Sequence, residues 1–152
     1  MKEIKLTKGK IALVDDDMFD LLSKHKWHAL SSKYASFEIG GEIVRMHRLV
    51  INAKECEFVD HIDGNTFNNQ RNNLRIATKS QNAMNMKNVR HTSQFKGVCW
   101  HKLAKKWMAQ IKCNYKRIYL GIFKEERDAA IAYDKAAIEH FGEFARLNFI
   151  QN

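Results

Sequence analysis

The sequence lacks proline entirely and has only seven glycines among its 152 residues. Low-complexity linkers are rich in these two residue types, so a long linker of that kind is excluded. The sequence also lacks any run of eighteen apolar residues, and its N-terminus, MKEIKLTKGKIALVDDD, carries charges throughout. We therefore expect neither a membrane-spanning helix nor an export signal, and we expect a soluble protein that is not secreted.

Cysteine is scarce as well. The three cysteines, Cys56, Cys99 and Cys113, form no CxxC pair and leave an odd count. The pattern supports neither a disulfide framework nor a cysteine-based zinc site, and it favours a reducing compartment. The chain does contain 45% hydrophobic and 11% aromatic residues, which is enough to build the core of one domain or of two small domains.

Acidic residues are missing from a long part of the chain. Between Gly64 and Lys124 there is no Asp or Glu, whereas the same 61 residues contain thirteen Lys and Arg. A solvated surface would mix both signs of charge, so this segregation indicates a surface that faces phosphates. The net charge of +9 and the pI near 9.5 agree with a polyanionic partner.

Residues 1–57 alternate between apolar and polar side chains in the manner of a small sheet, with a hairpin turn at Gly40-Gly41 and a strand at Ile43–Met46. The acidic run Asp15-Asp16-Asp17 has two interpretations, a metal cluster or the start of a helix. Apolar residues follow it at helical spacing, and acidic residues favour a helix N-terminus. We therefore predict a helix that begins there.

The stretch VDHIDGNTFNNQRNNLRIATKSQN, residues 59–82, is mostly too polar for a core. Its pattern predicts a strand that runs into Asp60 and His61, a long polar loop, a returning strand at Leu74–Ala77 and then a helix. The run Thr78-Lys79-Ser80-Gln81 fits a capping box at the start of that helix. The predicted order is strand, loop, strand, helix.

These residue types suit phosphodiester hydrolysis, which needs a base to deprotonate water and positive charge to stabilise the oxyanions. His61 is the candidate base, because an imidazole titrates near neutral pH. Asp60 and Asn82 offer a carboxylate and an amide oxygen, which suit Mg²⁺ or Mn²⁺ better than zinc. Asn73 is a candidate for holding the other nitrogen of His61. Neighbouring strand residues point to opposite faces, so Asp60 and His61 reach one site only at a strand end or a bulge.

The other polar residues of this region have plainer interpretations. We assign Asp63 to a turn, and we assign four loop asparagines to turn chemistry with some phosphate contact: Asn65, Asn68, Asn69 and Asn72. His47, which lies upstream, has two open interpretations. It either packs under the motif or touches the DNA backbone.

The ordered motifs MHRLV, VDHIDGN, NNQRNNLR and ATKSQN, within residues 45–85, resemble the HNH endonuclease family. The resemblance implies a ββα-metal fold in which Asp60 and Asn82 are metal ligands. It also implies His61 as the general base and Asn73 as its orienting partner. The motif ends in asparagine rather than histidine, as in phage homing endonucleases, and the structural zinc cysteines of some members are missing.

Residues 95–148 alternate clearly. The runs FKGVCWH, KKWMAQIKC and KRIYLGIF predict three strands. One face of this sheet is apolar, with Trp107, Ala109, Ile111, Ile118 and Leu120, and the other is mostly polar or basic, with Met108, Gln110, Lys112, Arg117 and Tyr119. A helix over Glu125–Phe141 is predicted to pack on the apolar face through Ala129, Ala132, Tyr133, Ala136 and His140. The polar face stays free to enter the major groove of DNA.

These runs, together with AAIAYDKAAIEHFG and LNF, resemble the AP2 DNA-binding domain over residues 95–149. The resemblance implies that the DNA-reading face comprises Lys96, Cys99, His101, Gln110, Lys112, Arg117 and Tyr119. We add Arg75 and Lys106 as basic candidates for DNA contact. Cys99 and His101 stand where plant members usually carry arginines, so the target sequence of the plant domains is not transferred to this chain.

The sequence thus predicts an α+β protein in three parts: an N-terminal β-rich region plus HNH nuclease domain over residues 1–83, a linker over 84–94 and an AP2-like domain over 95–152. We expect a homing-type endonuclease that uses Mg²⁺ or Mn²⁺ to cut double-stranded DNA, as a monomer or homodimer, without a protein partner or a membrane. We place it in the cytoplasm of a bacterial host or a phage-infected cell. The alternative is a DNA-binding regulator with an inactive HNH remnant. An RNA-binding protein would need more stacking aromatics than Tyr119 on the open sheet face.

Overall fold

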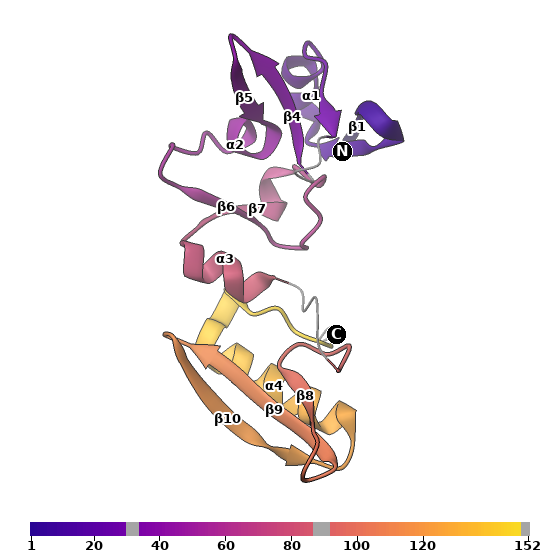
Figure 1. The fold of residues 1–152 in the computed structure, drawn as a ribbon. Helices are drawn as coiled ribbons and strands as arrows, with labels where there is room; N and C mark the ends of the chain where they lie inside the picture. The colour runs from indigo at the N-terminus through magenta and orange to yellow at the C-terminus, as the bar shows by residue number, and fades with distance from the viewer. Residues whose placement is uncertain (30–33, 87–91, 150–152) are drawn as a thin grey trace. The chain divides into compact units, whose positions relative to one another are not determined.

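The structure is a computed structural model and describes three stretches of the chain, residues 1–29, 34–86 and 92–149. Within these stretches the architecture is α+β, with four small sheets. Figure 1 shows the course of the chain. The chain divides into two compact units, Met1–Asn82 and Ala83–Asn152. No helix in the described stretches is both long enough and apolar enough to cross a membrane.

The first unit begins with a two-stranded antiparallel sheet, in which β1 (Lys2–Lys5) pairs with β2 (Ile11–Val14). A single 3-10 turn at Thr7–Gly9 connects the two strands. Helix α1 (Asp16–Leu22) follows directly, with Asp15 as its N-cap and two further aspartates in its first turn. The prediction of a helix start at the acidic run is confirmed. The carboxylates lie at the positive end of the helix dipole, which they stabilise.

A second, separate sheet consists of β3 (His28–Ala29), β4 (Ala35–Ile39) and β5 (Glu42–Arg45), in that order. The predicted hairpin turn at Gly40-Gly41 joins β4 to β5, and both glycines have positive φ. The expectation of one small sheet over residues 1–57 was wrong. The alternation of apolar residues identifies strands but does not say which strands pair.

The predicted strand at Ile43–Met46 ends one residue early, at Arg45, and helix α2 (Met46–Val50) begins in its place. Met46 and Val50 are both buried, because residues four apart lie on the same face of a helix. The sequence pattern concealed this helix, since five residues are too few to show a helical period.

The core of the first unit draws on every sheet of that unit. Its buried members are Ile4, Leu6, Ala12, Val14, Leu22, Trp27, Ala29, Ala35, Met46, Val50, Val59 and Leu74. Trp27 is the largest of them, and its indole Nε1 donates a hydrogen bond of 2.7 Å to the carbonyl of Leu22. Val59 and Leu74 belong to the polar stretch described above, so this core anchors the candidate site.

The polar stretch folds in the predicted order. Strand β6 (Phe58–His61) pairs antiparallel with β7 (Leu74–Ala77), and helix α3 (Lys79–Asn85) follows. The capping box is confirmed: the N–H of Gln81 donates to Thr78 Oγ1 at 3.2 Å, and the N–H of Thr78 donates to Gln81 Oε1 at 2.8 Å. These bonds satisfy two backbone groups that a helix start leaves unpaired.

The second unit is a three-stranded antiparallel sheet covered on one face by a helix (Figure 1). Its strands are β8 (Val98–His101), β9 (Lys106–Cys113) and β10 (Lys116–Phe123), in the order β10-β9-β8. Helix α4 (Glu126–Phe141) packs on the face that carries Ala109 and Ile111, and the prediction of both the strands and the helix is confirmed.

Two details of the second unit differ from expectation. His140 of α4 is exposed rather than packed on the sheet, and the helix buries Ala130, Ala137 and Phe141 as well as Ala129, Tyr133 and Ala136. The pairing of β9 with β10 also contains a register shift between Tyr119 and Gly121, which is a β-bulge. A bulge inserts one residue into one strand, so the side chains beyond it change faces.

Gly97 allows the closest approach in this unit. Its φ is +77°, and a Cβ at this position would lie 1.8 Å from Cδ2 of Tyr133. Only glycine leaves room for the Tyr133 ring there and accepts this backbone conformation without strain. The sequence therefore needs glycine at this point to bring α4 onto the sheet.

Part of the predicted linker, residues 87–91, lies outside the described residues. On its N-terminal side, α3 continues to Asn85, and Met84 packs against the second unit's core. On its C-terminal side, Thr92 Oγ1 accepts a hydrogen bond of 2.9 Å from the N–H of Trp100, and Ser93 is buried. The described ends of this segment are therefore folded.

Candidate active site and DNA-binding surface

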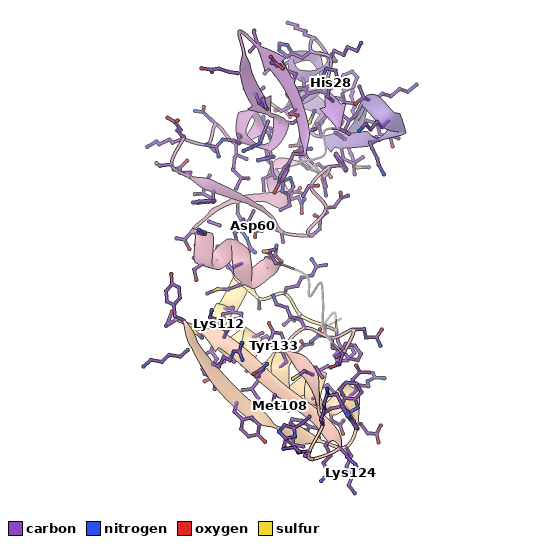
Figure 2. All side chains as sticks on the ribbon, viewed as in Figure 1. His28, Asp60, Met108, Lys112, Lys124 and Tyr133 are labelled. Atoms are coloured by element: carbon purple, nitrogen blue, oxygen red, sulfur yellow. The ribbon has the colours of Figure 1, made fainter. Side chains whose placement is uncertain are left out.

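Strand β6 brings Asp60 and His61 to its end as consecutive residues. β6 stops at His61, so the expected strand end is present, but the regular pairing of His61 with Leu74 keeps the two side chains on opposite sides of the strand. Asp60 is 4% exposed and His61 is 5% exposed, so both are buried (Asp60 is labelled in Figure 2). His61 shares the core-facing side of the strand with Val59, whereas Asp60 lies on the other side, opposite Arg75 of β7.

Asp60 is held by an arginine from the neighbouring strand. Arg75 donates to the carboxylate oxygen Oδ2 of Asp60 through Nε at 2.9 Å and through Nη2 at 2.8 Å. A buried carboxylate is tolerated when it is paired with a charge and hydrogen-bonded in this way. The sequence-based placement of Arg75 on the DNA-contacting surface therefore needs correction. Its guanidinium is largely buried and is turned toward Asp60.

The imidazole of His61 lies in surroundings that favour its neutral form. Burial lowers the pKa of His61 below its ordinary value, because the charged form loses hydration. A hydrogen bond with the side chain of Asn69 and the negative charges of Asp63 and Asp60 oppose this effect but do not cancel it. A neutral imidazole is the form that accepts a proton from water.

Asn73 does not orient His61, contrary to the prediction. Its Oδ1 accepts the N–H of Asp63 at 3.0 Å, while its Nδ2 donates to Asp63 Oδ1 at 3.0 Å and to the carbonyl of Asn68 at 2.9 Å. These bonds use both amide hydrogens and the amide oxygen. The asparagine that acts on His61 is instead Asn69, which is completely buried.

The polar loop is organised around Asp63, as the turn assignment predicted. Its carboxylate accepts from the N–H of Asn65 at 2.7 Å and from Nδ2 of Asn68 at 2.9 Å, besides Asn73. Burial raises the pKa of Asp63, but these hydrogen bonds outweigh it and hold the pKa below its ordinary value. The loop is therefore fixed by its own side chains, and it presents Asn69 to His61.

Two aromatic rings pack around His61. The ring centroids of His47 and His61 are 5.2 Å apart in an edge-to-face arrangement, and Tyr34 lies 4.8 Å from His47 and 6.0 Å from His61. His47 is buried, and burial together with neighbouring positive charges lowers its pKa to about 3. Of the two interpretations of His47, the structure has the one in which it packs under the motif. Sequence reasoning gave no signal for Tyr34.

Asn82 lies in the first turns of α3, where its N–H donates to the carbonyl of Thr78 at 2.9 Å. Asp60 and Asn82 together offer a carboxylate and a neutral amide oxygen, a donor set that fits a hard divalent cation. Within residues 1–29, 34–86 and 92–149, no group of three or more His, Cys, Asp or Glu side chains is arranged to hold a metal ion.

The open face of the second unit carries the polar side chains that the sequence placed there. Lys106, Lys112, Arg117 and Tyr119 are exposed, and Gln110 is half-buried among them (Lys112 is labelled in Figure 2). Cross-strand pairing sets Arg117 beside Lys112 and Tyr119 beside Gln110. Basic and amide side chains in this arrangement suit contact with phosphates and base edges.

Two other predicted DNA contacts have local partners within the second unit. The ammonium of Lys96 donates to the carbonyl of Met84, and burial lowers the pKa of Lys96 to about 8. Lys96 therefore stabilises the fold here instead of lying on the open face. His101 Nδ1 accepts the N–H of Ala104 at 3.1 Å, so this ring closes the turn between β8 and β9.

Comparison with known proteins confirms both resemblances. A family model described as HNH endonuclease matches residues 44–84, and a model described as AP2 domain matches residues 93–143. An uncharacterized HNH endonuclease of Acanthamoeba polyphaga mimivirus is 36% identical over 151 residues, which cover 94% of this chain and 77% of that protein.

Two further relatives each match part of the chain. Protein 3.8 of Escherichia phage T7 is 38% identical over 61 residues, covering 40% of this chain and 50% of the phage protein. An ethylene-responsive transcription factor of Arabidopsis thaliana is 34% identical over 96 residues, covering 60% of this chain and 58% of the plant protein. The chain thus spans half the length of the phage protein and 58% of the length of the plant protein.

Proposed function

We propose a division of labour for this chain, which belongs to the HNH endonuclease family and carries an AP2 domain. It is a DNA endonuclease of the HNH type, and the proposal concerns how the work is shared. The first unit hydrolyses the phosphodiester bond with the help of a divalent metal ion, and the second unit docks on double-stranded DNA. The observation that carries this proposal is the pair of consecutive buried residues, Asp60 and His61, at the end of β6.

His61 acts as the general base in this scheme. Its imidazole is buried, and burial favours the neutral form by lowering the pKa. A neutral imidazole nitrogen takes a proton from the attacking water, which turns the water into a competent nucleophile. The rings of His47 and Tyr34 pack against the imidazole and restrict it, so that the accepting nitrogen keeps one direction.

Asp60 and Asn82 are proposed to hold the metal ion, Mg²⁺ or Mn²⁺. When bound, the ion would neutralise charge on the phosphate and on the departing oxygen. Arg75 fixes the carboxylate of Asp60 through one oxygen, Oδ2, and thereby keeps the ligand in place before and after turnover. The role of Arg75 in this proposal is positioning and not contact with DNA.

The homing character is also part of the proposal. It is supported by the similarity to viral and phage proteins and by the asparagine that ends the HNH motif. An HNH unit that contacts mostly the DNA backbone needs another part of the protein to supply sequence specificity. A linked DNA-binding module also raises the effective concentration of the HNH unit at the target. Cleavage of a long DNA molecule at one defined site would support this part, and scattered cleavage would contradict it.

The metal requirement is tested by incubating supercoiled plasmid with the purified chain in Mg²⁺, in Mn²⁺ and in EDTA. We expect open-circle or linear product with a metal ion and no product in EDTA. Asn82→Ala should raise the metal concentration needed for half-maximal cleavage by about tenfold or more. Asn72→Ala, at an exposed asparagine of the polar loop, is the matched control and should leave that concentration unchanged.

Two results would contradict the proposal. One is cleavage in EDTA at the rate seen with metal, which would show that the reaction needs no metal ion. The other is an Asn82→Ala variant with the metal dependence of the unaltered chain, which would show that Asn82 does not bind the metal ion. Family membership already weighs against the alternative of a regulator with an inactive HNH remnant, and the plasmid assay tests that alternative directly.

A further inference from the structure

Three apolar side chains form a row across the open face of the second unit's sheet. Cys99 of β8 lies opposite Met108 of β9, and Met108 lies opposite Ile122 of β10. Partners opposite each other in an antiparallel sheet point to the same side. All three residues are partly or well exposed, with Ile122 at 37%. We call these three residues the apolar row.

The β-bulge in β10 creates this row. Ile118 packs toward α4, and uninterrupted alternation would place Ile122 on the same side. The register shift between Tyr119 and Gly121 instead pairs Ile122 with Met108, on the face opposite to Ala109. The bulge thus moves the large apolar side chain of Ile122 from the face that packs on α4 to the open face.

The apolar row continues directly into the polar part of the same face. The next cross-strand pair on the open face is Gln110 with Tyr119, and the one after it is Lys112 with Arg117. Nε2 of Gln110 lies 4.0 Å from Sγ of Cys99, which joins the two parts. One end of the face is therefore apolar and the other end is basic.

The chemistry of the major groove supplies a partner for each end. Basic side chains contact phosphates and guanine edges, whereas the thymine methyl group is the apolar feature of the groove. Phosphates do not suit an apolar row, because burying them against apolar groups costs hydration without compensation. The absence of acidic residues from Gly64 to Lys124 favours a polyanion such as DNA over a neutral or basic protein surface as the occupant of this face.

We propose that the apolar row binds thymine methyl groups, so that the AP2 unit selects A·T pairs at one end of its target and uses basic side chains at the other. This inference rests on the proposed docking of the second unit on double-stranded DNA. It adds that the apolar row reads A·T pairs. A methyl group buried on binding contributes about fourfold in affinity.

The test uses the full chain in EDTA, which stops cleavage without removing the open face. A binding duplex is first selected from random sequences, and each thymine is then replaced in turn by uracil, which lacks only the methyl group. We expect uracil to weaken binding about fourfold at two or more neighbouring positions at one end of the target. Fluorescence anisotropy measures each dissociation constant.

A matched pair of variants identifies the residue that is responsible. Ile122→Ser removes one of the three members of the apolar row, and Ile131→Ser changes an isoleucine of similar exposure, 39%, on α4. Ile122→Ser should lose the preference for thymine at one or more of these positions, while Ile131→Ser should keep the fourfold preference at all of them. Tryptophan fluorescence, through Trp100 and Trp107, checks that both variants are folded.

The outcomes separate this inference from the function on which it rests. Selective binding of one sequence without any effect of uracil would overturn the inference and leave the docking function intact. A uracil effect of unchanged size at every position in Ile122→Ser would also overturn it, because Ile122 would then contact none of the methyl groups. Failure to bind any duplex with preference would overturn both. Loss of the uracil effect at one or more positions in Ile122→Ser, with no loss in Ile131→Ser, supports the inference.

Discussion

The side chains proposed for catalysis in the first unit are buried, whereas those proposed for recognition in the second unit stand in solvent. Asp60 and His61 are at most 5% exposed, but Tyr119 is 60% exposed. Burial shifts the pKa of His61 and holds its ring among neighbours. A DNA-reading surface gains nothing from burial, because its partners arrive from outside. The two units therefore differ in what their polar groups must do before DNA is present.

The two units also differ in how their basic side chains are used. Arg75 is paired with a buried aspartate. Among the described residues of β9 and β10, no lysine or arginine forms an ion pair. A basic residue that already has an acidic partner contributes less to a phosphate-binding surface. Counting positive charges in the sequence overestimates the part of the chain that faces DNA.

The largest expected effect separates the chemistry of the first unit from the binding by the second. His61→Ala should lower the cleavage rate about 10²- to 10⁴-fold, because it removes the general base. DNA affinity should remain within about twofold, since the open face of β9 and β10 is untouched. Single-turnover cleavage rates and anisotropy titrations measure the two quantities. An equal loss in both would show that the division between the units is wrong.

The second prediction compares a buried basic residue with an exposed one. Arg75→Ala should lower the free energy of unfolding by about 3–5 kcal/mol, because it removes the positive charge that is paired with the buried carboxylate of Asp60. Lys112→Ala should change it by no more than about 0.5 kcal/mol. Urea unfolding at neutral pH measures both. Similar effects from the two substitutions would contradict the assignment of Arg75 to the interior.

The third prediction concerns acid stability. The pKa of His47 is about 3 in the folded protein, below its ordinary value of 6.5, so the unfolded chain binds this proton more readily. The contribution of neutral, buried His47 to the free energy of unfolding is therefore fully present above pH 6.5 and is lost as the pH falls toward 3. The loss from His47 between neutral pH and about pH 5 is about 2 kcal/mol, and the lowered pKa of His61 acts in the same direction.

This pH dependence is checked by urea unfolding at the two pH values. His47→Gln should reduce the loss on acidification, although the variant starts from a lower stability. His140→Gln, at an exposed histidine of α4, is the control. It should lose as much stability on acidification as the unaltered chain does. An unchanged pH dependence in His47→Gln would show that His47 is not buried in the neutral form.

The smallest expected effect concerns the basic end of the open face. Lys112→Ala and Arg117→Ala should each weaken DNA binding and lower the slope of log affinity against log salt by about 0.9, because each removes one phosphate contact. Cleavage at saturating protein should keep its rate. Titrations at several salt concentrations give the slope. The same slope in the unaltered chain and in both variants would show that these residues do not contact phosphates.

The sequence predicted the second unit better than the first. Alternation fixed its three strands, and Gly142 and the acidic first turn marked the ends of α4. Alternation did not reveal the bulge, because one extra residue leaves the composition of β10 unchanged. Ile122 was therefore not recognised as part of the open face.

Around His61, local pattern identified the strand, the loop and the capped helix, but not the contacts. Asn69 and Asn73 are chemically identical, so only the folded loop shows that Asn69 acts on the imidazole. Tyr34 and His47 come from other elements and meet His61 only through tertiary packing. Sequence reasoning finds residues of the right chemistry, and folding decides which of them are neighbours.

The bulge in β10 has a consequence for retargeting. The side chains that point outward beyond Tyr119 depend on the length of the strand as well as on its residues. Loss of one residue at the bulge would return Ile122 to the helix side and turn Phe123 outward, with every other recognition residue still present. Insertion or deletion at this point is therefore a second route to a new target, independent of substitution.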